Sequence, residues 1–379
     1  MRPPDSILVI VTRRIGDVLL ATPLIRSLRS AWPAAAIDAL VFAGTEGVLA
    51  ANPDVRRIVA VPENAKELSH LRTLFSLAGR YDLAVSTLPG DRPTFTAWLA
   101  GRRSVGLLLE GPKHFWKRLL LTRWVTFDES ETHMVLMNLT LSDLLGIGRC
   151  NDVVVSWSPA DEQRVAGVLP FLRTESFALL HLAPKYRYKM WRREGWRDVS
   201  RWLSDRGLRI VLTGGGDPDE LAYTEDIRRE MPAGTANLSG RLTLGEVGFL
   251  ISRARVYAGP DTAVTHMAAA LGVPTVALYG PTNPVKWGPW PRGYEGVFNP
   301  YPRRGSRRVG NVTLLQGPGE CVPCHQEGCD RHVDSFSACL QRLPTPLVTE
   351  ALEEALRMGN DRLHKENHPL IDSGPAGSS

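Results

Sequence analysis

The sequence predicts an α/β protein built from two doubly wound, Rossmann-like domains in tandem. Short, continuously apolar runs, typical of strands buried on both faces, alternate with segments of helical apolar spacing. The alternation starts at residues 6–12, stops near residues 156–175 and starts again at residues 176–182. The length of 379 residues also suits two domains of ordinary size.

The first domain, residues 1–160, begins with an apolar run. Its strands are expected at residues 6–12, 37–42, 57–61 and 83–88, and its helices at residues 17–31, 45–51, 65–79 and 131–146. Pro23 must lie in the first turns of its helix or bend it, because proline removes a backbone hydrogen bond. Residues 101–127 are expected to form a less regular basic segment.

The second domain, residues 175–345, repeats the alternation after a linker near residues 156–175. Its strands are expected at residues 176–182, 208–213, 255–258 and 274–279, and its helices at residues 196–206, 219–231 and 262–271. A further helix starts at Thr243, which forms a capping box with Glu246. A C-terminal helix over residues 346–358 follows, and residues 360–379 are expected to be a disordered tail.

The composition excludes several classes of protein. A charged fraction of 22% argues against global disorder, and no apolar stretch is long enough for a transmembrane helix. The net charge of +5 indicates anionic ligands or a basic face, not a histone-like nucleic-acid binder. Four of the five cysteines lie within residues 321–339, whereas a secreted protein would spread them as disulfides. We therefore expect a cytoplasmic protein.

The first strand-to-helix turn carries a candidate catalytic base. Arg13 and Arg14 follow the first strand, and Gly16 and Asp17 come directly after them. Ligands of doubly wound sheets bind at the carboxyl ends of the strands, where Asp17 could accept a proton while Arg14 holds an anion. The alternative is structural, since an aspartate at a helix start also caps free N–H groups and complements the helix dipole.

A basic aromatic loop at residues 183–197 follows the first strand of the second domain. It contains six lysines and arginines against one glutamate, with two tryptophans and two tyrosines among them. Lys189 could hold a phosphate group as a point charge. The alternative is a solvated charged loop, although exposed aromatic side chains need a partner.

Three further turns follow strands of the second domain. Residues 214–216 are three glycines before Glu220, whose carboxylate could accept hydrogen bonds from a ribose. Residues 259–266 open a helix whose free N–H groups and positive dipole end suit a diphosphate, and His266 lies one turn further on. The alternative there is a helix cap with a packed histidine. Residues 279–284 would line the same pocket.

These turns resemble those of the heptosyltransferases of glycosyltransferase family 9, which build the inner core of bacterial lipopolysaccharide. The resemblance covers roughly residues 6–290. Its marks are Gly16-Asp17 before an apolar helix with Pro23, Lys189 two residues before Trp191, Asp261-Thr262 with His266, and Gly280-Pro281-Thr282. It implies the GT-B fold, in which an N-terminal acceptor domain faces a C-terminal nucleotide-sugar domain across a cleft. It also implies ADP-L-glycero-D-manno-heptose as donor and the lipopolysaccharide inner core as acceptor.

The resemblance implies a role for each matching residue. Asp17 takes the position of the general base, and Lys189 that of the lysine that contacts the donor diphosphate. Glu220, or its neighbour Asp219, matches an acidic donor contact. The remaining donor-binding positions are Asp261, Thr262, Ala263, His266 and Thr282. The family often has glycine at the position of Ala263. The implied reaction inverts the anomeric carbon and needs no metal, in keeping with the absence of an Asp-x-Asp-like pair at the donor loop.

Cations in the first domain are expected to hold the acceptor. They are Arg14, Lys113, Lys117 and Arg118. Phe115 and Trp116 could rest at the level of lipid headgroups, so weak contact with the cytoplasmic face of the inner membrane is expected. The alternative is a charged surface loop that leads into a core element. The resemblance implies no nucleic-acid partner, and we expect a monomer.

Four cysteines form a separate cluster, Cys321, Cys324, Cys329 and Cys339. Four thiolates can hold a structural zinc ion in a tetrahedral site, with His325 and His332 as alternative ligands. The alternative is that the cysteines are reduced or joined in disulfides.

Two other functions compete with sugar transfer. One is another enzyme of the same fold, such as a nucleotide-sugar epimerase, which would need no acceptor site. The other is a non-catalytic nucleotide-sugar or nucleic-acid binding module, whose basic aromatic loop would stack bases. Release of ADP from ADP-heptose, accelerated by an acceptor, distinguishes a transferase from both.

Overall fold

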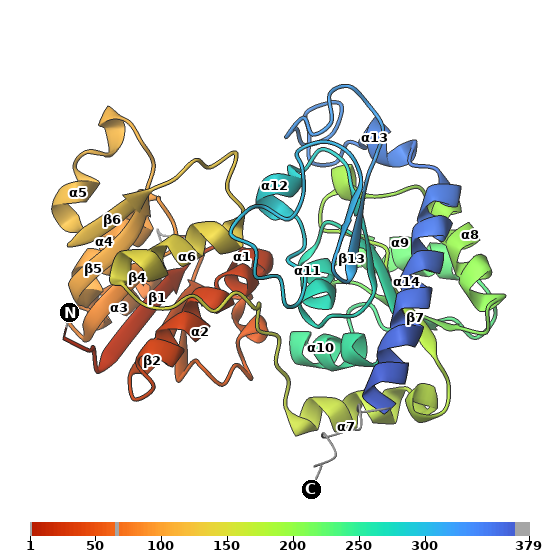
Figure 1. The fold of residues 1–379 in the computed structure, drawn as a ribbon, viewed down its shortest axis with the longest axis horizontal. Coiled ribbons are helices and arrows are strands. Elements are labelled where there is room, and N and C mark those ends of the chain that lie inside the picture. Colours follow the sequence, from red (N-terminus) through yellow and green to blue (C-terminus); the bar gives the residue numbers. More distant parts are fainter. Residues whose placement is uncertain (1, 65–67, 368–379) are drawn as a thin grey trace, which may run out of the picture.

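Two predominantly parallel sheets, one in each half of the chain, form the framework of the protein (Figure 1). The computed structural model describes residues 2–64 and 68–367. The first sheet has the order β3-β2-β1-β4-β5-β6 and is parallel throughout. Its strands are β1 Ser6–Val11, β2 Ala36–Phe42, β3 Arg57–Val61, β4 Tyr81–Ser86, β5 Gly101–Leu108 and β6 Arg123–Thr126. The apolar run predicted to be a doubly buried strand is β1, whose residues 7–11 are buried.

Helices cover both faces of this sheet. They are α1 Ile15–Leu20, α2 Thr22–Ala31, α3 Leu68–Ser76, α4 Asp91–Ala100, α5 Lys117–Leu120 and α6 Met134–Leu145. Leu74 of α3, Ala97 of α4 and Leu121 after α5 share one core cluster with Leu8 and Ile10 of β1. Residues of α1, α2 and α6 belong to the cluster on the opposite face.

The second sheet repeats the strand order of the first. Its order is β12-β13-β11-β10-β7-β8-β9, with β12 as an added antiparallel edge strand. Its strands are β7 Phe177–His181, β8 Arg209–Thr213, β9 Ala236–Asn237, β10 Val256–Pro260, β11 Thr275–Tyr279, β12 Arg307–Val309 and β13 Val312–Gln316. In both sheets the first strand of the domain is central, so the carboxyl ends of the central strands meet at one edge, where such sheets bind ligands.

The helices of the second domain follow the expected alternation. They are α7 Pro159–Val168, α8 Arg193–Ser204, α9 Pro218–Arg228, α10 Leu244–Arg253, α11 Ala263–Ala270, α12 Pro284–Trp287, α13 Ala338–Gln341 and α14 Thr345–Asn367. The capping box of α10 is confirmed, because the Glu246 amide donates to Thr243 Oγ1 and the Thr243 amide donates to Glu246 Oε2, over 3.2 and 2.7 Å.

Several predicted elements of the first domain are corrected by the structure. The helix expected at residues 17–31 is two helices, because Pro23 starts α2 in its first turn. The helix expected at 45–51 is only a single 3₁₀ turn at Glu46–Val48. Residues 101–127 are more regular than expected and contain β5, α5 and β6, and the prediction missed α4 before them. Residues 65–67 of the helix expected at 65–79 lie outside the described residues.

Two further segments differ in secondary structure from the prediction. The linker expected near residues 156–175 contains helix α7, which begins with Pro159 and is capped by Ser158 and Asp161. Proline at the first position starts a helix instead of interrupting one. The C-terminal helix α14 continues to Asn367, so residues 360–367 are not a tail, and residues 368–379 lie outside the described residues.

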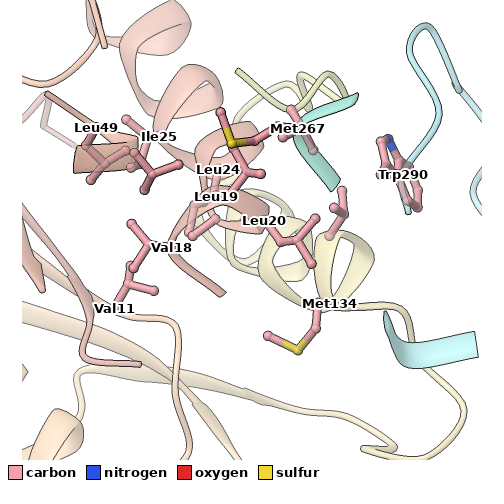
Figure 2. Close-up of a cluster of buried hydrophobic side chains, with 14 of the residues drawn as sticks. Val11, Val18, Leu19, Leu20, Leu24, Ile25, Leu49, Met134, Met267 and Trp290 are labelled. Carbon is pink, nitrogen blue, oxygen red and sulfur yellow. The ribbon is translucent and has the colours of Figure 1, made fainter. Parts of the chain in front are cut away.

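The two domains share a hydrophobic cluster. Figure 2 shows Leu20 of α1 and Met134 of α6 in one cluster with Met267 of α11 and Trp290, which belong to the second domain. Helix α1 contacts helix α11 directly. This contact fixes the first turns of both helices on the same cleft. In the described part of the chain, no helix is long and apolar enough to cross a membrane.

Candidate active site

The two domains meet where helix α1 contacts helix α11. A Cβ atom built on Gly16 would lie 3.9 Å from Cδ2 of His266, so the backbone of the first domain approaches this histidine of the second. Asp17 follows Gly16 in the first turn of α1, and Thr262 is the N-cap of α11. The two motifs that the sequence singled out most strongly are therefore brought together across the cleft.

Asp17 is a buried carboxylic acid, 6% exposed. Its Oδ1 atom has no hydrogen-bond partner among the described residues. Burial raises the pKa of Asp17, and the charges of Arg13 and Lys286 and the Arg14 backbone amide oppose this rise. The unpartnered Oδ1 atom could accept a proton from a substrate hydroxyl.

Lys189 and Asp261 form an ion pair at the end of the central strands. Lys189 Nζ lies 2.6 Å from Asp261 Oδ2, and the side chains are 22% and 9% exposed. Burial alone would raise the pKa of Asp261. The charge of Lys189, together with the hydrogen bond and charge of His266, outweighs burial, so the pKa of Asp261 is lowered. Burial alone would lower the pKa of Lys189. The charge and hydrogen bond of Asp261 outweigh burial, so the pKa of Lys189 is raised. Asp261 therefore holds a positively charged ammonium group in the cleft.

The N-terminus of α11 lies beside this ion pair. Thr262 caps the helix with extended backbone, and Ala263 is its first helical residue, so the amides of the first turn have no carbonyl partner within the helix. His266 is buried, with Nε2 3.8 Å from Asp261 Oδ1. Its Nδ1 atom is buried and finds no partner in the described chain. The turn thus combines helix amides, an ammonium group and an imidazole that can meet an anion.

Glu220 occupies the glycine-rich turn after β8. The amide of Gly215 donates to Glu220 Oε2 over 3.1 Å. A Cβ atom on Gly215 would lie 2.5 Å from the same oxygen, so a side chain at this position would displace the Glu220 carboxylate. Burial raises the pKa of Glu220, and the nearby Lys185 charge opposes the rise. Asp219 is exposed in the first turn of α9, so the structure makes Glu220 the better placed of the two acids.

The turn at Thr282 and Asn283 leads into α12 and touches the first domain. Asn283 caps α12 and also donates from Nδ2 to the Ser130 carbonyl over 2.8 Å. Lys286 of α12 forms an ion pair with Glu129 at 2.7 Å. Thr282 is half-buried beside this contact. These two bonds fix this turn to the loop that precedes α6.

Arg14 reaches across the cleft to the basic aromatic loop. Its guanidinium donates to the Tyr186 hydroxyl and lies 4.9 Å from the centre of the Tyr186 ring. Tyr186 stacks on Tyr188, with ring centres 5.4 Å apart. The aromatic side chains of residues 183–197 therefore have partners within the protein, and the solvated-loop alternative does not describe them.

A cavity of about 580 Å³ opens at the carboxyl edge of the first sheet. Arg13 and Glu129 line it on the cleft side, and Arg92, His114 and Lys117 line it on the side of α4 and α5. Like the first turns of α1 and α11, it opens at the edge where such sheets bind ligands. It therefore offers room for a second substrate on the first domain.

Lys117 is buried, although we expected it to lie in an exposed basic segment. Its side chain is only 2% exposed, and Nζ lies 2.6 Å from the Pro89 carbonyl and 2.7 Å from Asp91 Oδ1. The unpredicted helix α4 brings these acceptors against it. Lys117 is therefore a buried cation of the cavity wall, whereas Lys113 and Arg118 are exposed as expected.

The four cysteines are free thiols in the described chain, and Cys321 and Cys329 are exposed. Burial, with the other three thiols nearby, raises the pKa of Cys339 to about 11. No group of three or more His, Cys, Asp or Glu side chains in residues 2–64 and 68–367 is arranged to hold a metal ion. The zinc site and the reduced or disulfide-bonded alternatives therefore stay predictions.

Three residues of the site were not predicted. Asp91 forms an ion pair with Lys117. The charge of Lys286 lowers the pKa of Asp17. His133 Nε2 lies 2.8 Å from the carbonyl oxygen of Gly288 in the other domain. Burial lowers the pKa of His133 to about 3, so this histidine is neutral and joins the two domains by a hydrogen bond. The sequence offers no signal for them, because their partners lie far away in the chain.

Comparisons with known proteins show which family and fold this chain shares. The profile of glycosyltransferase family 9 (heptosyltransferase) matches residues 111–313, more than half of the chain. Lipopolysaccharide heptosyltransferase 3 of Escherichia coli is 28% identical over 81% of this chain and 94% of its own length. The structure of a glycosyl transferase family 9 protein from Veillonella parvula DSM 2008 superposes with a TM-score of 0.75 at 20% identity, covering 93% of this chain and 97% of that one. E. coli heptosyltransferase WaaC with ADP-2-deoxy-2-fluoro heptose gives a TM-score of 0.67 at 19% identity, covering 92% and 99%.

The protein is thus a glycosyltransferase with the GT-B fold. It belongs to glycosyltransferase family 9, the heptosyltransferase family.

Proposed function

We propose that this enzyme transfers a heptose from ADP-L-glycero-D-manno-heptose to the inner core of lipopolysaccharide. Membership of the family supports heptosyl transfer. The similar E. coli protein is named a lipopolysaccharide heptosyltransferase, and a structural neighbour holds an ADP-heptose analogue. The donor lies on the second domain and the acceptor on the first.

The donor diphosphate binds between Lys189 and the N-terminus of α11. The ammonium group supplies a point charge that Asp261 orients, and the amides at Thr262 and Ala263 supply hydrogen-bond donors. Glu220, in the turn after β8, accepts hydrogen bonds from the ribose. His266 and Thr282 complete the donor side of the cleft.

Transfer proceeds by a single displacement with inversion. The acceptor hydroxyl oxygen attacks the anomeric carbon while Asp17 takes the hydroxyl proton. The bond between the anomeric carbon and the β-phosphate oxygen breaks, and ADP leaves with the electron pair. Lys189 and the α11 amides stabilise the negative charge that develops on the diphosphate. These groups supply the required positive charge themselves, so we expect transfer to continue in EDTA.

The acceptor enters through the cavity on the first domain. Arg13, Arg92 and Lys117 give its lining three cations against the acids Asp91 and Glu129, and the inner core carries carboxylates and phosphates. Arg14 holds the acceptor side of the cleft next to Asp17. We further infer a monomer that works on the cytoplasmic face of the inner membrane and binds no nucleic acid.

One observation carries this proposal. The contact between α1 and α11 brings the buried Asp17 carboxylate to the cleft that holds the Lys189–Asp261 ion pair. The test is ADP release from ADP-heptose, alone and with truncated lipopolysaccharide acceptors. A transferase releases ADP slowly alone and much faster with the right acceptor. Release that no acceptor accelerates, or no release at all, would contradict sugar transfer and favour an epimerase or a binding module.

A further inference from the structure

The backbone on both sides of Lys189 is hydrogen-bonded to helix α13 and its N-cap. Ser337 Oγ donates to the Tyr188 carbonyl over 2.7 Å, and Gln341 Nε2 donates to the Met190 carbonyl over 2.9 Å. Neither carbonyl accepts a hydrogen bond from a backbone amide of the described residues. The two side chains therefore bracket Lys189, the residue proposed to meet the donor diphosphate.

Two more hydrogen bonds continue this contact toward α8. Trp191 Nε1 donates to the Leu343 carbonyl over 3.0 Å, and Arg192 Nη2 donates to Thr345 Oγ1 over 2.7 Å. The Trp191 ring is buried. Residues 337–345, which we call the α13 segment, thus follow the loop of Lys189 bond by bond, although the two lie far apart in the sequence.

Ser337 does not perform the task that serine usually has at its position. It is the N-cap of α13, and an N-cap serine commonly accepts a hydrogen bond from an amide of the first turn. Ser337 makes no such bond, and its hydroxyl donates to the Tyr188 carbonyl instead. The residue is only 2% exposed, so its removal would leave a carbonyl that water does not readily reach. The hydroxyl therefore serves the Lys189 loop and not its own helix.

The α13 segment also packs against a second turn of the donor site. A Cβ atom built on Gly280 would lie 2.7 Å from Leu340 Cγ and 3.0 Å from Cys339 Sγ. Thr282 follows two residues further along the chain. Figure 1 shows α13 and α12 at the same end of the second domain. One short helix thus contacts both the Lys189 loop and the turn that leads to Thr282.

The Lys189 loop has little regular structure of its own. Between β7 and α8 it forms a single 3₁₀ turn, Arg187–Lys189. From this turn the Lys189 ammonium group reaches Asp261 at 2.6 Å. Because lysine has a long, flexible stem, the place of its charge depends on where the backbone is held. A shift of about 1 Å in this loop would move the ammonium group away from the position that binding requires.

We propose that Ser337 and Gln341 are positioning residues for Lys189. By fixing the carbonyls on both sides of it, they hold the ammonium group beside Asp261 and the N-terminus of α11. They act on the donor through Lys189 and are not catalytic residues. This inference rests on the proposed function, because it requires that Lys189 contacts the donor diphosphate.

The first test measures binding of ADP by isothermal titration calorimetry. Ser337→Ala and Gln341→Met should each bind ADP roughly threefold more weakly than the unaltered protein, and the double variant about tenfold more weakly, because each change removes one hydrogen bond. Ser335→Ala is the matched control and should bind ADP normally. Its hydroxyl also donates to a carbonyl, that of Glu327, but makes no bond to the Lys189 loop. Equal binding of the double variant and the control would overturn the proposal.

The second test asks whether the effect passes through Lys189. In the Lys189→Met background, adding Ser337→Ala/Gln341→Met should change ADP binding by less than about twofold, because the group that they position is gone. A further tenfold loss in this background would mean that the two residues support the whole site, and it would overturn the positioning role. Thermal unfolding identifies a variant that does not fold, and if the double variant fails, the single variants decide.

The same measurements separate this inference from the proposed function. Weak ADP binding by Lys189→Met, with normal binding by the Ser337 and Gln341 variants, overturns the positioning role alone. Normal ADP binding by Lys189→Met overturns the proposed contact of Lys189 with the diphosphate, and the positioning role falls with it.

Discussion

The two domains have the same strand order but use the edge of the sheet differently. In the second domain, the strand ends carry a compact site in which Lys189 and Asp261 are paired and mostly enclosed. In the first domain, the same edge opens into a cavity of about 580 Å³. A diphosphate is small and constant, so a rigid, prepaired site suits it. The acceptor sugar of the proposed function is larger, and the first domain supplies the cavity and the proposed base, Asp17.

The largest expected effect falls on the base. Asp17→Asn should lower kcat by roughly two orders of magnitude or more, because the amide cannot accept the acceptor proton. Binding of the donor should change little, since the donor lies on the other domain. Steady-state kinetics with both substrates measures this. Asp5→Asn, at the opposite end of β1, is the control and should keep normal turnover. Near-normal turnover of Asp17→Asn would reduce this residue to a helix cap.

The next effect sharpens the account of the donor site. Lys189→Met should raise the KM for the donor by about ten- to a hundredfold and leave that for the acceptor nearly unchanged. It should also lower the Tm, because Asp261 is left as an unpaired charge in a mostly buried position. Lys189→Met/Asp261→Asn should recover much of the Tm without recovering donor binding. Recovery of donor binding would show that the ion pair is only structural.

The residues proposed to bind the donor could be selected from the sequence, whereas the cavity proposed for the acceptor could not. Lys189, Glu220 and Asp261 lie in the connections that follow β7, β8 and β10, so the parallel alternation brings them toward one edge. The cavity around Lys117 draws its lining from several strand ends and helices. Lys117 was expected at the surface because helix α4, which covers it, was not recognised.

The remaining errors have similar causes. Pro159 was interpreted as the end of periodicity, although proline at the first turn also starts a helix. Contacts between the domains, such as that of His133 with Gly288, join residues far apart in the chain, and no local pattern signals them. The succession of strands along the chain and the positions of the turns follow from local periodicity. The pKa of Asp17 depends on burial, which local periodicity does not reveal.

The pH profile of activity tests whether Lys286 of the second domain lowers the pKa of Asp17, the proposed base of the first domain. Burial raises the pKa of Asp17, and Lys286 is one of the charges that oppose this rise. The base must be ionised, so kcat/KM falls as pH drops through this pKa. Lys286→Met removes a charge that lowers the pKa, and the acid limb should move to higher pH by up to about one unit. Lys286→Arg keeps the charge and should leave the limb in place. If the acid limb of the Lys286→Met profile did not move, Lys286 would not influence the pKa of Asp17 and this account would be contradicted.

The smallest effect on activity is expected at the cysteines of the second domain. Exposed Cys321 and Cys329 should react quickly with a maleimide, and buried Cys339 slowly, because burial raises its pKa to about 11. Mass spectrometry of the labelled protein measures the order. Protection of all four thiols, together with about one zinc per chain in elemental analysis, would instead support the structural zinc site. Transfer activity of Cys324→Ser should remain normal in either case, since the cluster takes no part in the proposed chemistry.

The division of labour between the domains is tested most directly by equilibrium binding of ADP, measured by isothermal titration calorimetry on three variants. Asp17→Asn and Lys117→Met alter the first domain, and each should bind ADP within about twofold of the unaltered protein. Lys189→Met alters the second domain and should bind at least about tenfold more weakly, because it removes the cation that faces the diphosphate. Loss of ADP binding in the first-domain variants, or normal binding in Lys189→Met, would contradict the account.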